Sequence, residues 1–168
     1  LKRVLVAALT LVILTLGALA VSADFRKAVY TMIQKFLPIE MQLTYQVDGE
    51  PLEQLPNGYS DHYVLDGFER DYEQGYDDAQ AFLHVYTDIM TNDFYTVSCA
   101  IVQNQNQKEL FDNEHTKYRK VKMGDVEALL GEDKNTGYYL IWEDEGITHT
   151  IIGRISIKEL MLVAQKIY

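Results

Sequence analysis

An uncharged apolar segment at residues 4–23 is the feature that most constrains what this chain can fold into. The segment reads VLVAALTLVILTLGALAVSA, which is about the 20 residues that an α-helix needs to cross a bilayer core. It has no polar face, so it does not fit a helix packed inside a soluble domain. We therefore expect residues 1–23 to be a transmembrane anchor, and the rest of the chain to be the extracytoplasmic part of a single-pass protein of the cell membrane.

A cleaved signal peptide is the alternative interpretation of this segment. Lys2 and Arg3 provide a basic start, and residues 21–23 (VSA) resemble a cleavage site. Signal peptides have an apolar stretch of about 7–15 residues, so the longer stretch here favours a retained anchor. Arg26 and Lys27 follow the segment and balance the two basic residues before it, so charge alone does not fix the orientation.

The chain beyond this segment is acidic. Of the 15 Lys and Arg and 25 Asp and Glu residues of the whole chain, only Lys2 and Arg3 precede Asp24, so residues 24–168 carry a larger negative charge than the net −10 of the whole chain. Nucleic-acid binding requires a basic surface, and we expect no nucleic-acid partner. Cys99 is the only cysteine, which excludes an intramolecular disulfide and leaves the fold to depend on its hydrophobic core.

Residues 24–38 are predicted to form an amphipathic helix that connects the anchor to the domain. Their apolar side chains recur at helical spacing, and Pro38 would end the helix. The apolar positions are Phe25, Ala28, Val29, Met32, Ile33 and Phe36.

Residues 39–168 are predicted to form an α+β domain with one curved antiparallel sheet, arranged as a meander. Short alternating stretches separated by Gly-containing turns are typical of such strands. We expect strands at 40–47, within 63–74, and at 82–90, 94–103, 115–123, 126–131, 138–142 and 147–152, with the polar stretch 103–108 as an exposed connection.

A C-terminal helix is predicted to cover one face of this sheet. Ser156 and Glu159 have the spacing of a capping box, in which each residue satisfies a backbone N–H at the start of a helix. One apolar face follows, formed by Leu160, Val163, Ala164 and Ile167.

The end of the chain resembles a bacterial family, domain-of-unknown-function family forty-three sixty-seven. The resemblance covers roughly residues 60–168, and a weaker motif lies at 63–68 (YVLDGF), where Leu65 replaces the proline usual in the family. It implies the extracytoplasmic domain of a single-span membrane protein, in some cases associated with anti-sigma factors, and implies no catalytic residue. The matching residues are Trp142, Gly146, Gly153, Ser156, Glu159, Leu160 and Ala164.

No residue pattern in the chain predicts a catalytic, cofactor or metal site. The four histidines have no metal-ligand spacing, the acidic groups lack the spacing of a calcium loop, and no nucleophile motif is present. Aromatic and imidazole side chains that cluster in sequence are the candidate ligand contacts: Tyr59, His62, Tyr63 and Tyr72.

Three functions remain open at this point. The leading one is a non-enzymatic sensory or interaction domain that meets an unknown protein or small ligand outside the cell, of which the outer half of an anti-sigma-type regulator is one form. The alternative is a carrier-like module for a lipid or peptide, which predicts a pocket between sheet and helix. A hydrolase is the third, and it requires a polar cleft that joins His62 or His149 to a carboxylate and a hydroxyl group.

Overall fold

The computed structural model describes residues 29–36, 40–48, 50–103 and 107–168 of the chain. The expected anchor at residues 1–23 lies outside these residues. Within the described ranges, no helix combines the length and the hydropathy needed to cross a bilayer.

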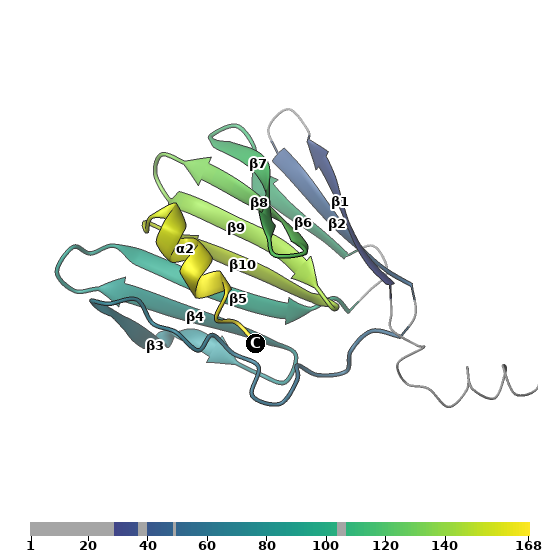
Figure 1. Cartoon of the computed structure of the whole chain (residues 1–168), viewed down its shortest axis with the longest axis horizontal. Helices are drawn as coiled ribbons and strands as arrows, with labels where there is room; N and C mark the ends of the chain where they lie inside the picture. Colours follow the sequence, from purple (N-terminus) through teal and green to yellow (C-terminus); the bar gives the residue numbers. More distant parts are fainter. Residues whose placement is uncertain (1–28, 37–39, 49, 104–106) are drawn as a thin grey trace, which may run out of the picture.

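Two antiparallel sheets and one helix make up the described part of the fold (Figure 1). The smaller sheet has the order β1-β2-β6 and the larger one the order β3-β4-β5-β10-β9-β8-β7. The elements are β1 (Val29–Phe36), β2 (Glu40–Asp48), β3 (Phe68–Asp77), β4 (Ala81–Asp88), β5 (Phe94–Ile101), β6 (Gln107–Asp112), β7 (Thr116–Met123), β8 (Val126–Asp133), β9 (Gly137–Asp144), β10 (Ile147–Gly153) and α2 (Ile157–Ala164).

The large sheet consists of two meanders, β3-β4-β5 and β7-β8-β9-β10, that join where β10 pairs with β5. Tight turns set the register of neighbouring strands. Glu145 and Gly146 connect β9 to β10 with φ angles of 49° and 86°. Two successive positive φ angles are the geometry of a two-residue hairpin turn whose twist matches that of the strands.

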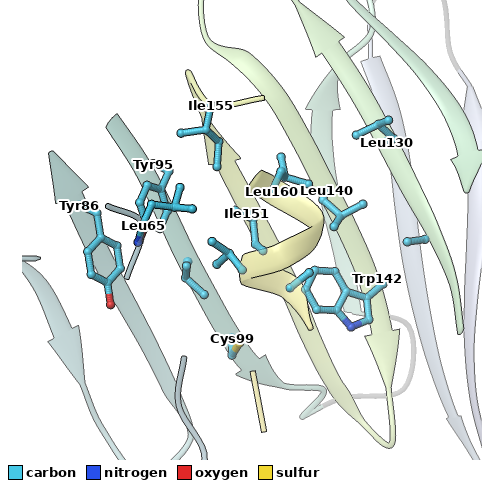
Figure 2. Close-up of a cluster of buried hydrophobic side chains, with 14 of the residues drawn as sticks. Leu65, Tyr86, Tyr95, Cys99, Leu130, Leu140, Trp142, Ile151, Ile155 and Leu160 are labelled. Carbon is cyan, nitrogen blue, oxygen red and sulfur yellow. The ribbon is translucent and has the colours of Figure 1, made fainter. Parts of the chain in front are cut away.

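Successive residues of the central strands face two separate hydrophobic cores. On β9, Leu140 and Trp142 point to the side covered by α2, whereas Ile141 between them points to the small sheet. The first core is large and includes Tyr86, Tyr95, Cys99 and Ile151, several of which are labelled in Figure 2. The second core lies between the sheets and contains Met41, Leu43, Tyr45, Val102, Leu129 and Ile141.

Helix α2 lies across the face of the large sheet, in front of its central strands (Figure 1). The Ser156 hydroxyl accepts a hydrogen bond from the Glu159 backbone N–H, and the Glu159 carboxylate accepts one from the Ser156 N–H. This is the predicted capping box. Leu160, Val163 and Ala164 are buried on the predicted apolar face. The expected α+β class, with antiparallel strands and a C-terminal helix, is confirmed.

The predicted helix at 24–38 is wrong over Val29–Phe36, which forms strand β1. β1 pairs antiparallel with β2 along its whole length, from Val29↔Asp48 to Phe36↔Met41. This pairing supplies the backbone hydrogen bonds that a helix would have made internally, and Met32 packs against the second core.

The single expected sheet is instead two sheets. The chain leaves the large sheet after β5, adds β6 to the edge of β2, and returns at β7. β6 begins at Gln107, inside the polar stretch for which the sequence predicted only a connection.

Candidate functional site

A cavity of about 390 Å³ opens between the end of α2, the β7–β8 hairpin and the ends of β9 and β10. We call it the His149 cavity. It is lined by Tyr59, Met123, Gly124, Val126, Trp142, Asp144, His149, Ala164, Gln165 and Ile167.

The lining is graded from a buried floor to an exposed rim. Trp142, His149 and Ala164 are buried and form the floor. Half-buried side chains form the wall: Tyr59, Met123, Val126 and Ile167. Gly124, Asp144 and Gln165 are exposed at the rim. An aromatic and apolar interior therefore meets solvent at a polar edge, as in typical small-molecule sites.

His149 is held between an aromatic ring and a phenol. Its ring stacks on the indole of Trp142, with centroids 4.4 Å apart and planes inclined by 3°. Its Nε2 lies 2.6 Å from the Tyr59 hydroxyl oxygen. The stacking follows from the fold, because β10 pairs with β9 and places His149 opposite Trp142.

Burial keeps His149 uncharged. It lowers the pKa of the imidazole to about 3, against the opposing effect of the backbone of Trp142 and Ile147. The ring is therefore a neutral hydrogen-bonding group at physiological pH.

The Nδ1 atom of His149 is buried and has no partner in hydrogen-bond geometry. The side chain as a whole is 2% exposed. Buried polar atoms are paired in the great majority of cases, so an unpaired one in a residue that lines a cavity calls for an explanation, such as a small rearrangement that lets a ligand group or a water reach it.

Tyr59 is also neutral in this environment. Burial raises the pKa of its hydroxyl, and Cys99 and the acidic pair Asp144 and Glu145 add to the increase.

A second polar centre lies on β3, β4 and the segment that precedes β3. His84 Nδ1 is 2.5 Å from Asp61 Oδ1, and His84 Nε2 is 2.7 Å from Asp77 Oδ1. Tyr86 donates its hydroxyl to the other oxygen of Asp61, and Arg70 pairs with Asp77 at 2.7 Å. We call these five residues the His84 cluster.

The carboxylates on either side of the ring favour the protonated form of His84. Its burial lowers the pKa, but the hydrogen bonds to Asp61 and Asp77 outweigh burial and raise it overall. The hydrogen bond from His84 also lowers the pKa of Asp77. An imidazolium uses both ring N–H groups as donors, which fits a carboxylate on each side.

One short segment joins the cavity to the cluster. Tyr59 lines the cavity, and Asp61, two residues later, accepts from His84. The segment is fixed to the end of the chain by backbone hydrogen bonds: Ser60 N–H to Tyr168 O, Tyr168 N–H to Ser60 O, and His62 N–H to Lys166 O. A movement of Tyr59 would therefore also displace Asp61 and residues 166–168.

The structure separates the four ligand contacts that the sequence suggested. Only Tyr59 lies in the His149 cavity. His62 is exposed, stacks on Tyr168 and contacts its carbonyl oxygen at 3.0 Å. Tyr63 packs against the large core beside the start of α2. Tyr72 is 77% exposed on edge strand β3, with Arg70 over its ring.

Several cavity residues were not suggested as site residues from the sequence. Trp142 was named only among the residues that match the family, Asp144 was not named, and His149 was considered only for a hydrolase. A detectable signal was the position of His149 within an alternating strand, where it shares the inward face with Ile147 and Ile151. A histidine at such a position must be paired or line a cavity.

The contacts of the described His84 and Cys99 side chains restrict their reactivity. Both ring nitrogens of His84 contact carboxylates, so neither is available to take a proton from a nucleophile. Burial raises the pKa of the Cys99 thiol, which disfavours the reactive thiolate. In the part of the chain that the structure describes, no group of three or more His, Cys, Asp or Glu side chains is placed to hold a metal ion.

One family matches this chain. Its description is "Domain of unknown function (DUF4367)", and it covers residues 58–167, a range that contains the lining of the His149 cavity and the His84 cluster. No curated protein and no solved structure is significantly similar to the chain.

Proposed function

The chain belongs to the DUF4367 family, and from this premise we propose that it is a non-enzymatic, ligand-binding sensory domain on the outer side of a single-span membrane protein. The ligand is a small amphipathic molecule that enters the His149 cavity. Its apolar body lies against the Trp142–His149 floor, and its polar group stays near the rim.

The observation that carries this proposal is the unpaired, buried Nδ1 of His149 on the floor of an open cavity. Pockets of roughly 300–1,000 Å³ hold drug-sized ligands, and the His149 cavity, at about 390 Å³, is at the small end of that range. This size favours a single-ring or short-chain ligand over a two-chain lipid. A carrier for lipids or peptides, the second candidate, would have to use the same cavity.

A sensory role follows from where the ligand would sit. Occupation of the cavity favours one position of Tyr59. A shift of Tyr59 moves the segment 59–62, which is hydrogen-bonded to the His84 cluster and to residues 166–168. A ligand shifts a conformational equilibrium only through contacts that differ between the two states. The Tyr59–His149 hydrogen bond is such a contact, because an incoming polar group competes for it.

The membrane context of the proposal rests on the apolar segment at residues 4–23. With this segment as the anchor, the cavity lies outside the cell, and an anti-sigma-type regulator is the most specific form of the function. Alkaline phosphatase fused after Tyr168 and expressed in bacteria should then be active, because the enzyme folds only outside the cytoplasm. An inactive fusion, with an active β-galactosidase fusion at the same point, would contradict this topology.

Ligand binding can be followed through Trp142, since it is the only tryptophan of the chain and lies on the cavity floor. The probe is 4-phenylbutan-1-ol, a neutral amphiphile, titrated into the protein with a panel of other neutral amphiphiles of similar size. We expect a saturable change in Trp142 emission. The proposal fails if no member of the panel changes the emission up to its solubility limit.

A matched pair of variants locates the binding. Val126→Phe places a larger side chain in the cavity wall, which reduces the space for the ligand and should weaken binding severely. Val121→Phe makes the same change on β7, where the side chain packs against the large core outside the cavity, and should leave the affinity unchanged. Equal affinities of the two variants would place the probe elsewhere.

A further inference from the structure

We propose that Asn57 is a site of spontaneous deamidation, at which the side-chain amide becomes a carboxylate and an isoaspartyl linkage forms next to the His149 cavity. Asparagine is among the chemically labile residues of proteins, and Asn57-Gly58 is the only Asn-Gly pair in the chain. This modification does not depend on the proposed function.

The turn around Asn57 leaves the reacting groups accessible. The Tyr59 N–H donates to the carbonyl oxygen of Pro56 at 2.9 Å, and Gly58 has a φ of +78°. This is the geometry of a type II turn with Asn57 and Gly58 at its two central positions. Both residues are exposed, and a Cβ added at Gly58 would meet nothing within 4 Å. The turn therefore has room for the ring that the reaction forms.

The reaction needs only water as a co-reactant. The Gly58 nitrogen attacks Cγ of Asn57, a cyclic imide forms, the Cγ–Nδ2 bond breaks, and ammonia leaves with the proton of the Gly58 N–H. Water then adds to one of the two imide carbonyl carbons and opens the ring. Opening at one carbonyl gives an ordinary aspartyl linkage, and opening at the other routes the main chain through the side-chain carbons.

The attacking nitrogen distinguishes Asn57 from the other asparagines that the structure describes. The N–H that follows each of those asparagines is already a hydrogen-bond donor. The three bonds run from Asp93 N–H to Thr91 Oγ1 at 3.2 Å, from Glu114 N–H to Asp112 Oδ1 at 2.8 Å, and from Thr136 N–H to Asp133 Oδ1 at 2.8 Å. Within the described ranges, the Gly58 N–H has no such acceptor. Its nitrogen is therefore the one that can approach Cγ without breaking a bond first.

The isoaspartyl product lengthens the main chain by one carbon between two fixed points. The fixed points are the backbone hydrogen bonds from Leu55 N–H to Ala79 O at 2.8 Å and from Ser60 N–H to Tyr168 O at 3.1 Å. The extra length has to be taken up within residues 56–59, and Tyr59 is the residue of that segment that lines the His149 cavity. The modification thus moves the Tyr59 hydroxyl away from His149 Nε2, from which it lies 2.6 Å in the unmodified chain.

Peptide mapping by mass spectrometry tests the modification. The full chain is incubated for several weeks at pH 6 and at pH 8, and samples are digested over time. We expect isoaspartate to accumulate at position 57 before any product appears at Asn92, Asn113 or Asn135, and faster at pH 8, because attack requires loss of the Gly58 amide proton. Asn57→Gln should lose the signal, since its longer side chain forms the ring poorly. An intact Asn57 at the end of the incubation, or equal conversion of all four asparagines, would overturn the proposal.

A second measurement tests the effect on Tyr59. The isoaspartyl form is separated by ion exchange, and the Nε2 resonance of His149 is compared with that of the unmodified chain by NMR. Asn57→Asp is the matched control, because it adds the charge without the extra carbon. We expect the resonance to shift in the isoaspartyl form alone. No shift in that form, or an equal shift in the control, would refute the displacement of Tyr59 by a longer chain while the modification site stands. Neither result bears on ligand binding, which the Trp142 titration decides separately.

Discussion

Asp61 and His84 form a buried ion pair in which the carboxylate oxygen lies 2.5 Å from the ring Nδ1 and both side chains are 1% exposed. The two residues come from different parts of the fold, since Asp61 precedes β3 and His84 lies in the middle of β4. The pair therefore fastens the segment that carries Tyr59 to the large sheet. Asp77, on the other side of the ring, is 62% exposed and faces solvent, so the cluster runs from the core to the surface.

We predict that Asp61→Asn lowers the free energy of unfolding by about 3 kcal/mol, because it leaves a buried imidazolium with one carboxylate in place of two. Urea denaturation at pH 6 measures the change. Asp66→Asn removes an exposed carboxylate five positions along the same connection and should cost less than about 0.5 kcal/mol. Equal effects of the two substitutions would contradict a charged His84.

His84 predicts a loss of stability on the alkaline side of neutrality. Its folded-state pKa is raised above the unfolded value of 6.5, so its contribution is complete below pH 6.5 and is lost as the pH rises through the folded-state pKa. Unfolding free energies between pH 6.5 and 9 should decrease in the wild type, and His84→Gln should flatten the curve. His115→Gln is the matched control, because His115 pairs with Asp112 at an exposed site, where solvent screens the interaction.

The buried, neutral state of His149 predicts that the free energy of unfolding falls as the pH is lowered below 6.5. Its folded-state pKa is lowered to about 3, so below pH 6.5 the unfolded chain binds a proton that the folded protein does not. Stability should therefore fall between pH 6.5 and 5 with a slope that approaches about 1.4 kcal/mol per pH unit. His149→Phe should remove most of this slope. An NMR titration in which the His149 ring protonates above pH 5 would refute the buried neutral state.

The backbone at Gly137, at the start of β9, is predicted to tolerate only glycine. Its φ is +91°, and an added Cβ would lie 2.2 Å from the carbonyl oxygen of Gly153 on the paired strand β10. We expect Gly137→Ala to cost about 3 kcal/mol or more, because neither strand can retreat. Gly124→Ala also places a side chain at positive φ, +62°, but with nothing within 4 Å, and should cost about 1 kcal/mol. Thermal denaturation of the two variants compares them.

The C-terminal half of the fold could be predicted from the sequence because its signals are local. β7 alternates polar and apolar residues, β8 to β10 are short apolar stretches between tight turns, and the capping box at Ser156 and Glu159 marks the first turn of α2. β1 was mistaken for a helix because its apolar residues recur at helical spacing, and its pairing with β2 overrode that pattern. β6 was hidden by the polar composition of its first residues.

The candidate site was less accessible to sequence reasoning, since its members meet only after folding. Tyr59 and His149 are 90 residues apart, and His84 meets Asp61 across 23 residues. No spacing rule connects such pairs. The sequence did indicate which face of its strand each histidine occupies. His84 lies on the same face of β4 as the buried residues Phe82 and Tyr86, and His149 lies on the same face of β10 as Ile147 and Ile151. The position of a residue in the strand pattern thus predicts which polar side chains are buried, but not which side chains they contact.

The pairing of β2 with β6 has a mechanical consequence. β6 belongs to the segment matched by the family, whereas β1 and β2 precede that segment. Tension applied at Val29 thus reaches the large sheet along two parallel paths: the covalent chain that follows β2, and the register from Glu40↔Asp112 to Tyr45↔Gln107. The β2–β6 pairing is short, and the packing of Met41, Leu43 and Tyr45 in the second core bears part of the same force. It makes the small sheet the part of the fold that a pull on the preceding chain would strain first.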